Sequence, residues 1–241
     1  MLTLIDTGIE DIVASQLYSR TFASYPNENP FSDGGLWSYP VGTDKLEVSS
    51  GILECNGLYG GFGVLSDVLS QDCYCISTIS NLSLNAGGSA SIALALRLTS
   101  GFTAGVQLTL NGFSPTPKFT LGDSTGKSYI TSETPIQFVN GDSLGLFLIG
   151  SNWYVTLNGV VVFKGTEAAL FNNHASIACI PSSAITTAQV SAFSCGNLGR
   201  GAVRGYDATG ARRNIRWNAD YFPTDSELTK YHDAPSYLQN T

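Results

Sequence analysis

The sequence predicts an all-β fold in which two antiparallel sheets stack face to face. Residues 143–165 read as three short strands in which apolar residues alternate with others. The second break between them, Asn158 and Gly159, is the residue pair that best accepts the positive φ angles of a type I′ hairpin turn. The chain also has 26 glycines and 9 prolines and no sustained helical period, which fits many turns between short strands. A meander that buries one face suits a sandwich of sheets.

Further strands are expected along most of the chain. The cleanest spans residues 91–99, where Ile92, Leu94 and Leu96 face inward and only small residues or Arg97 stand between them. The remaining expected strands are 46–55, 58–65, 73–80, 105–110, 118–121, 128–131, 136–139, 176–180 and 187–195. The core is expected to contain Ile92, Leu94, Leu96, Leu146, Trp153 and Val155.

Both ends of the chain differ from this middle part. Residues 1–20 predict an N-terminal arm with a short helix, because Thr7 and Glu10 form a capping box and Ile12 and Leu17 follow at helical spacing. Residues 21–198 are assigned to the sandwich. Residues 199–241 predict an extended tail, since they carry aromatic residues without an apolar period that would give them a core of their own. A second capping box after Pro223 predicts a short helix in this tail.

Charge is sparse and unevenly distributed. Charged residues make up 13% of the chain and the formal net charge is −7, which argues against general binding to nucleic acid. Five arginines and one aspartate in residues 200–216 give that segment a local charge of +4. No apolar run approaches the roughly 18 residues that a membrane helix needs, and the first residues lack the basic start of a signal peptide. We therefore expect a protein made in the cytoplasm, with neither nucleic acid nor membrane as partner.

The five cysteines match neither a disulfide framework nor a zinc motif. Cys73 and Cys75 share one strand face, and free thiols that pack as small apolar groups are the simplest interpretation. A disulfide between Cys179 and Cys195 on neighbouring strands stays open, as does the state of Cys55. The two histidines stand far from cysteines or carboxylates at ligand spacing, so no metal or other cofactor is expected.

Three segments together resemble a known superfamily. The string from Asp142 to Val160, DSLGLFLIGSNWYVTLNGV, is similar to the "strand, Gly-Asn-x-Trp, strand, Asn-Gly, strand" signature of concanavalin A-like (laminin-G-like) jelly rolls. Residues 20–22 and 29–37, ending at Trp37, resemble the entry segment of that superfamily, and residues 190–196 resemble its closing strand. The resemblance covers about residues 20–196 and implies a jelly-roll sandwich. It says little about function, because the fold hosts lectins, glycosidases, adhesion modules and virus structural proteins.

The functional patterns of the superfamily do not carry over. The Glu-x-Asp-x-x-Glu strand of its retaining glucanases is absent, so no catalytic residue is assigned and we expect no enzyme activity. Trp37 and Trp153 fall on sandwich patterns and are expected in the core rather than in a sugar site. Candidate calcium ligands by residue type are Asp123, Asp142, Asn158, Asn172 and Asn173, but turn chemistry explains each of them.

The favoured functional hypothesis is a structural component of a virus particle, because a low-charge jelly roll with two terminal arms resembles phage virion proteins such as capsid decoration proteins, head fibres and tail accessory proteins. The expected localisation is the virion, and the expected partners are other capsid or tail proteins and copies of the chain itself. The expected partner-binding residues are Arg212, Arg213, Arg216, Trp217, Tyr221 and Phe222. The alternative is a lectin-like module that binds a glycan.

Overall fold

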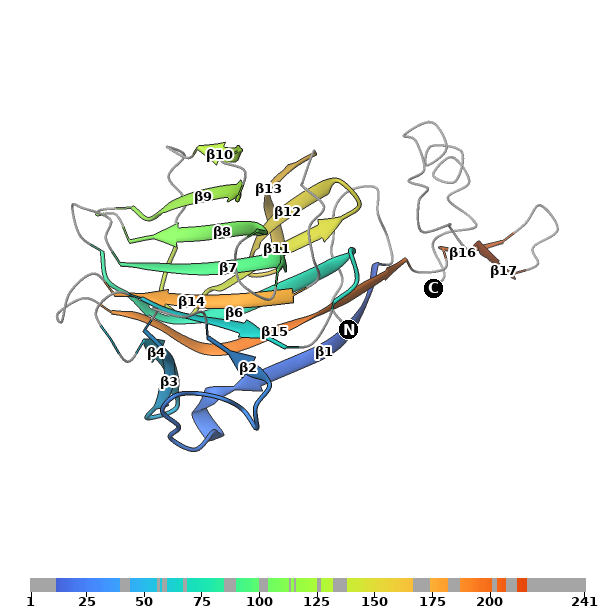
Figure 1. Ribbon diagram of the computed structural model, residues 1–241. Helices are drawn as coiled ribbons and strands as arrows, with labels where there is room; N and C mark the ends of the chain where they lie inside the picture. Colours follow the sequence, from blue (N-terminus) through green and yellow to red (C-terminus); the bar gives the residue numbers. More distant parts are fainter. Residues whose placement is uncertain are drawn as a thin grey trace. The chain divides into compact units, whose positions relative to one another are not determined.

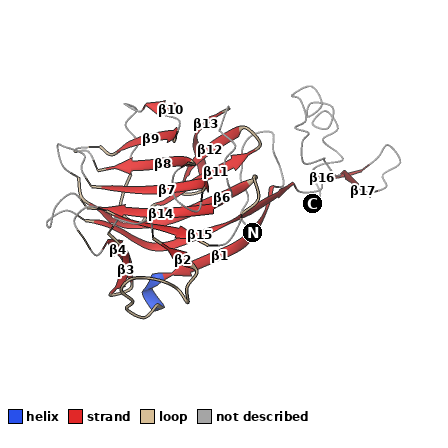
Figure 2. Ribbon diagram, in the orientation of Figure 1, coloured by secondary structure: helices blue, strands red, loops and turns tan. Residues whose placement is uncertain are grey.

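The computed structural model is almost entirely β-structure over the part of the chain that it describes (Figure 2). The described residues are 12–39, 44–55, 57, 60–66, 69–84, 90–99, 104–112, 114, 116–124, 127–131, 138–166, 174–181, 187–200, 203–206 and 212–215. Among them the one helix is a single 3-10 turn, η1 (Phe22–Ser24). No helix long and apolar enough to cross a membrane occurs in these residues.

The strands form two stacked antiparallel sheets (Figure 1). Sheet A runs in the order β13 (Val160–Gly165), β12 (Asn152–Leu157), β11 (Ser143–Ile149), β6 (Cys73–Leu82), β15 (Ala188–Arg200), β4 (Ile52–Cys55), β3 (Leu46–Ser49), and β1 (Ile12–Thr21) also pairs with β15. Sheet B runs in the order β10 (Ser128–Thr131), β9 (Lys118–Asp123), β8 (Val106–Asn111), β7 (Ser91–Leu98), β14 (His174–Ile180), β5 (Gly61–Leu65), β2 (Trp37–Ser38). The predicted all-β jelly-roll sandwich is confirmed.

The core lies between the two sheets and is built from alternate residues of their strands. Leu94 on β7, Leu146 on β11 and Val155 on β12 are fully buried in it, as the alternating patterns predict. Trp37 and Trp153 also belong to this core cluster, so neither indole is available for stacking on a sugar. The core placements expected for all six named residues are confirmed.

Turn chemistry sets the strand boundaries. Asn158 and Gly159 adopt φ angles of 52° and 80° between β12 and β13, and the predicted type I′ hairpin turn is confirmed. Ser50 and Gly51 adopt φ angles of 52° and 79° in the same way, so the single strand expected over residues 46–55 is wrong. That segment is the β3–β4 hairpin. The strand expected over residues 136–139 is also wrong in its described part, since residues 138 and 139 are in no strand.

The predicted N-terminal helix is wrong from residue 12 onward, where the structure describes the chain. Residues 12–21 form β1, a strand that pairs with β15, whereas the helical spacing was read through Ile12 and Leu17. Tyr18 explains why the strand wins. Its ring is buried against Trp37 and Phe193, with centroid separations of 5.5 and 6.1 Å, and this tertiary contact outweighs the local helical preference.

Arg97 lies between the sheets and not on the outer face that strict alternation assigns to it. Across the β7–β14 pair, Ala95 is opposite Ser176 and Leu98 is opposite His174, so two residues of β7 face Ala175 alone. This β-bulge, with φ of 55° at Arg97, turns the guanidinium inward and leaves it fully buried. Sequence alternation cannot reveal a bulge, because one extra residue reverses the facing of the side chains that follow.

The chain divides into two compact units, one of residues Gln16–Asn197 and one of Met1–Ser15 with Leu198–Thr241. In the second unit the structure describes a two-stranded hairpin of β16 (Val203–Tyr206) and β17 (Arg212–Ile215), paired from Val203 and Ile215 to Tyr206 and Arg212. This hairpin lies within the segment that was expected to be an extended tail with one short helix. The helix expected after Pro223 lies outside the described residues.

Candidate functional site

The candidate site is the outer face of sheet A, the face turned away from the sandwich core. Its side chains are the residues that alternate with the core positions on β3, β4, β15, β6, β11 and β12. Three groups follow one another across it. They are an aromatic row (Tyr74, Phe147, Tyr154), a central area of short side chains (Thr78, Ala192, Ser194) and a polar row (Glu47, Glu54, Gln189, Asn81).

The aromatic row crosses three neighbouring strands in direct register. Phe147 on β11 is opposite both Tyr74 on β6 and Tyr154 on β12. The Tyr74 and Phe147 rings stack with centroids 5.7 Å apart and an interplanar angle of 16°. Only 3% of Tyr74, 2% of Phe147 and 6% of Tyr154 is exposed, so these rings are no open platform for stacking on a ligand. Ligand contacts on this face must therefore come from its other two groups.

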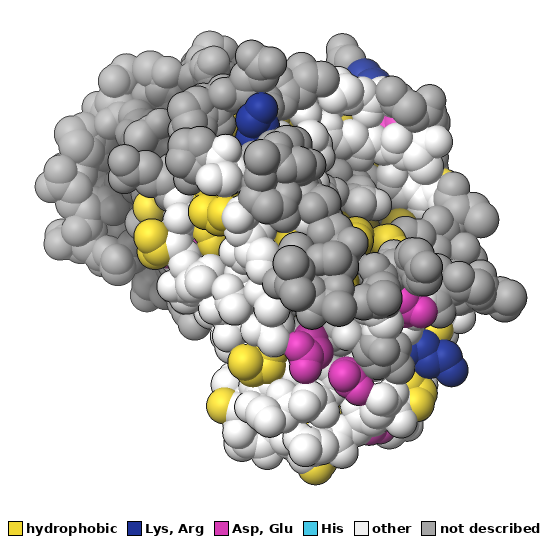
Figure 3. All heavy atoms as spheres, turned by 90° about the vertical axis from the view of Figure 1, so that its left-hand side faces the viewer, with side chains coloured by type: hydrophobic (Ala, Val, Ile, Leu, Met, Phe, Trp, Pro, Cys, Tyr) yellow, Lys and Arg dark blue, Asp and Glu magenta, His cyan; other side chains and the backbone are white. Residues whose placement is uncertain are grey.

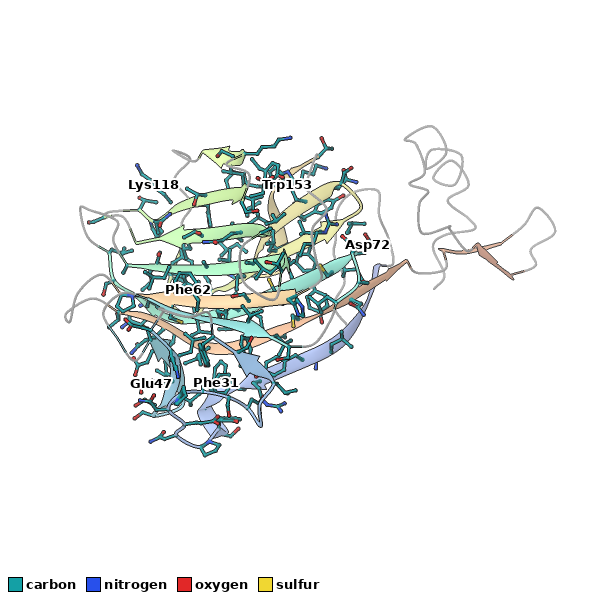
Figure 4. The ribbon with its side chains drawn as sticks, viewed as in Figure 1. Phe31, Glu47, Phe62, Asp72, Lys118 and Trp153 are labelled. Atoms are coloured by element: carbon teal, nitrogen blue, oxygen red, sulfur yellow. The ribbon has the colours of Figure 1, made fainter. Side chains whose placement is uncertain are left out.

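The polar row begins at the β3–β4 hairpin. Glu47 on β3 is directly opposite Glu54 on β4, and both carboxylates are partly exposed. Figure 4 labels Glu47 at this end of the sandwich and Asp72 far from it. The turn at Ser50 and Gly51 brings the two acids together, because a two-residue hairpin loop fixes the register of its strands.

Amide side chains complete the row and hold the carboxylates in place. Gln189 on β15 donates from Nε2 to Oε2 of Glu54 at 2.7 Å. Asn29 donates from Nδ2 to Oε2 of Glu47 at 2.5 Å. Asn81 on β6 is opposite Gln189 and accepts a 3.2 Å hydrogen bond at Oδ1 from Asn140. The row thus crosses four strands, about 14 Å at the usual strand spacing, and presents acceptor oxygens beside amide donors.

A network of hydrogen bonds fixes the loop that carries Asn29. Nε of Arg20 lies 2.8 Å from Oδ2 of Asp33, and the hydroxyl oxygen of Tyr25 lies 3.1 Å from both Asp33 Oδ1 and Glu28 Oε2, which share its one proton as acceptors. Glu28 is also joined to Val48 of β3 by two backbone hydrogen bonds of 2.9 and 3.0 Å. The loop is therefore tied to the strand that carries Glu47, and Asn29 is held beside that carboxylate.

The charge of Glu54 opposes the ionisation of Glu47 on the facing strand. Burial, and then the charge of Glu54, raise the pKa of Glu47 above its usual value. A carboxyl group with a raised folded-state pKa binds more protons in the folded protein than in the unfolded chain, so its contribution to stability falls as pH rises through that pKa. At neutral pH the facing of Glu47 and Glu54 therefore lowers the stability of the folded protein.

We expect Glu47→Gln to stabilise the protein at pH 7 and to have no effect well below the carboxyl pKa. Removing a like charge directly across a strand pair should raise the unfolding free energy by about 0.2–1 kcal/mol, and the glutamine oxygen still accepts from Asn29. Thermal unfolding of both proteins from pH 3 to pH 8 measures this. A gain that is equal at every pH would show that charge repulsion is not its cause.

Sequence reasoning missed the polar row, although one signal for it was present. In LEVSSGILEC, residues 46–55, apolar residues and glutamates alternate on either side of Ser50 and Gly51. Reading that pair as a hairpin turn would have placed Glu47 opposite Glu54. No local signal connects Gln189 with Glu54, since 135 residues separate them.

The partner-binding residues predicted in the tail are only partly placed. The backbones of Arg212 and Arg213 lie on β17, where they pair with Tyr206 and Gly205. Arg216, Trp217, Tyr221 and Phe222 lie outside the described residues. Attachment to a virus particle through residues 199–241 stays a prediction.

The candidate calcium ligands that are described serve turns. Asp142 accepts hydrogen bonds from Val139 N at 2.9 Å and from Asn158 Nδ2 at 2.7 Å, and Asp123 accepts from Tyr129 OH and Lys127 N. Asn172 and Asn173 lie outside the described residues. Over the part of the chain that the structure describes, no three acid, histidine or cysteine side chains form a group that would hold a metal ion.

Known structures share this fold at low sequence identity. The chain matches no protein-family model, and no curated protein matches its sequence. A Bacillus subtilis protein of unknown function with a galectin-like fold is 11% identical, with 78% of this chain and 100% of that chain covered and a TM-score of 0.55. The carbohydrate recognition domain of Emp46p is 11% identical, with coverage of 74% and 95% and a TM-score of 0.54.

A third neighbour, the apo Crh5 transglycosylase, is 9% identical, with coverage of 76% of this chain and 85% of that chain and a TM-score of 0.54. Identities this low establish the fold alone. This chain therefore shares a two-sheet sandwich fold with these structures, and the sequence resemblance implied such a fold. These neighbours include both a carbohydrate recognition domain and a transglycosylase, so the function has to be argued from the residues of this chain.

Proposed function

We propose that this protein binds carbohydrate through the polar row on the outer face of sheet A, without hydrolysing it. The observation that supports the proposal best is the row itself, in which Glu47, Glu54, Gln189 and Asn81 lie side by side and partly exposed across four strands. Sugar hydroxyls both donate and accept hydrogen bonds. Carboxylates accept, and side-chain amides do both, so the row matches that chemistry.

The neighbouring surface also suits an extended ligand. Thr78, Ala192 and Ser194 are short side chains on β6 and β15 next to the polar row, and each is partly exposed. A sugar chain can approach the sheet closely there, and the length of the row fits a short oligosaccharide better than a single sugar. The carbohydrate recognition domains of Emp46p and Emp47p have the same fold, with TM-scores of 0.54 each, which supports a glycan as the ligand class.

The charges of the site select among glycans. Two carboxylates face the ligand, and the whole chain has a formal charge of −7. Figure 3 views the molecule from the left-hand side of Figure 1 and shows Asp and Glu side chains in the lower half of that face. Neutral sugars and amino sugars with a free ammonium group fit such a surface, whereas sialylated, sulfated or uronic acid glycans are repelled.

The proposal predicts that Gln189→Ala weakens glycan binding by about tenfold. The substitution removes one ligand-facing amide and the donor that orients Glu54. A typical hydrogen bond contributes about 0.5–1.5 kcal/mol, and about 1.4 kcal/mol is tenfold in affinity. A panel of neutral, amino and anionic oligosaccharides identifies the ligand, and calorimetric titration measures its affinity.

Gln107→Ala is the matched control for this experiment. Gln107 is a partly exposed glutamine on β8, on the outer face of sheet B, and it donates to Thr109 at 3.0 Å. Its removal should leave glycan affinity unchanged. Equal losses in both variants, or binding to none of the panel, would contradict a site on sheet A.

Glycoside hydrolysis is the second candidate function, and one observation favours it. Glu47 and Glu54 are directly opposed, with Cβ atoms about 4.5–5.5 Å apart, and the raised pKa of Glu47 is the direction that a general acid needs. We favour binding because both carboxylates already accept hydrogen bonds from neighbouring amides. Release of reducing ends from the bound glycan by wild-type protein, lost in Glu54→Gln, would establish hydrolysis instead.

A further inference from the structure

Two buried cysteines face each other on adjacent strands of sheet A. In the register of β6 and β15, Cys75 is directly opposite Cys195. Both side chains are fully buried in the core between the sheets, and no disulfide joins them. The two side chains therefore lie next to each other on the core-facing side of sheet A.

This placement matches the geometry of a disulfide. Directly opposed residues of an antiparallel pair have Cα atoms about 4.5–5.5 Å apart, and disulfides span Cα separations of about 4.4–6.8 Å. Burial raises the pKa of Cys75 most, and the next cause is the charge of Cys195.

We propose that Cys75 and Cys195 are a disulfide-forming pair that can join the central strand β6 to the C-terminal strand β15. With glutathione disulfide as oxidant, one cysteine thiolate attacks a glutathione sulfur and releases one glutathione thiolate. The second cysteine thiolate then attacks the mixed disulfide and releases another. Two protein thiols lose two protons and two electrons, and one glutathione disulfide becomes two glutathione thiols.

The other cysteines do not compete for this bond in the folded chain. Cys73, on the same strand face, is opposite Leu148 on β11 and Asn197 on β15. Cys179 lies on β14 of sheet B, where burial and then the charge of Cys55 raise its pKa. The sequence left open a Cys179–Cys195 disulfide between neighbouring strands, and β14 and β15 are not neighbours, since they belong to different sheets.

The burial of Cys75 and Cys195 determines when the disulfide can form. The thiolate is the attacking species, and a fully buried thiol with a raised pKa supplies very little of it at neutral pH. The bond should form while β15 is still pairing with β6. Protein folded in the reduced state should resist the same oxidant.

The test refolds the denatured, reduced full chain in a glutathione redox buffer and, in parallel, in dithiothreitol. We expect the first sample to lose two thiols and to gain on the order of 10 °C in Tm. Chymotrypsin cleaves after Tyr74 and Phe193, which separates Cys73 from Cys75 and Cys179 from Cys195. Mass mapping of the wild-type digest therefore identifies the pair without any variant.

Variants give a matched comparison. Cys195→Ala should abolish the oxidant-dependent Tm gain, and Cys73→Ala, a fully buried cysteine two residues from Cys75, should retain it. Mapping that shows five free thiols after oxidative refolding, or only a link between Cys55 and Cys179, would overturn the proposal. The wild-type map decides the matter even if a variant fails to fold.

Discussion

Replacing Arg97 with alanine is expected to lower the unfolding free energy by about 3–6 kcal/mol, because two carbonyls lose a charged donor and each such hydrogen bond contributes about 1.5–3 kcal/mol. The guanidinium is fully buried at one end of the core. Its Nε and Nη2 donate to the carbonyl of Gln71 at 3.0 and 2.8 Å, and Nη2 also donates to the carbonyl of Gly150 at 2.6 Å. One residue of sheet B thus holds two loops of sheet A.

The loss in Arg97→Ala has two sources. The carbonyls of Gln71 and Gly150 lose their hydrogen bonds from the charged guanidinium. The substitution also empties the space of the side chain while φ stays positive at a non-glycine residue. The substitution should also weaken the hydrogen bond at Asp72, whose Oδ1 accepts from Gly150 N at 2.7 Å. The turn at Gly150 is no longer held by the guanidinium in the variant.

Chemical denaturation measures this prediction, with two comparison variants. Arg97→Lys keeps a charge but loses the planar fork that serves two carbonyls, so an intermediate loss is expected. Lys45→Ala removes a cation from an exposed position and should stay within about 0.5 kcal/mol of wild type. A loss below about 1 kcal/mol in Arg97→Ala would show that the buried guanidinium contributes little.

The sequence was sufficient for the class of fold because the signals it needs are local. Alternation in residues 91–98 and 143–157 identifies strands whose inward residues form the core, and the Asn158–Gly159 turn fixes one hairpin. The same reasoning failed wherever a pairing across the sheet decided the outcome. Residues 12–21 follow a helical spacing but form β1, because β15 offers a partner strand and Tyr18 a buried aromatic contact.

The candidate site was out of reach for a related reason. The polar row exists because Glu47, Glu54, Gln189 and Asn81 come from four strands, and only the order of strands in sheet A makes them neighbours. The Cys75–Cys195 pair has the same origin. No residue of the polar row or of the cysteine pair stands out in the sequence. The register between distant strands brings them together, and only then can they bind a ligand or form a disulfide.

Leu94→Ala is expected to destabilise the sandwich by about 2–5 kcal/mol. Leu94 is fully buried at the centre of sheet B, opposite Leu108 on β8 and Ile177 on β14. Truncation loses the transfer energy of three carbon atoms and leaves a cavity between residues that regular pairing holds in place. The size of the loss reports how well the surrounding core can close around the missing atoms.

Leu84→Ala provides the matched control for this change, since it is the same substitution at a leucine that is 45% exposed. It should stay within about 0.5 kcal/mol of wild type in the same denaturation experiment. Equal effects at both positions would mean that the two leucines share one environment, which would contradict the register of β7 in sheet B. Because the inward facing of Leu94 also fixes which residues of sheet B face outward, that result would remove Gln107 as the control for the glycan site.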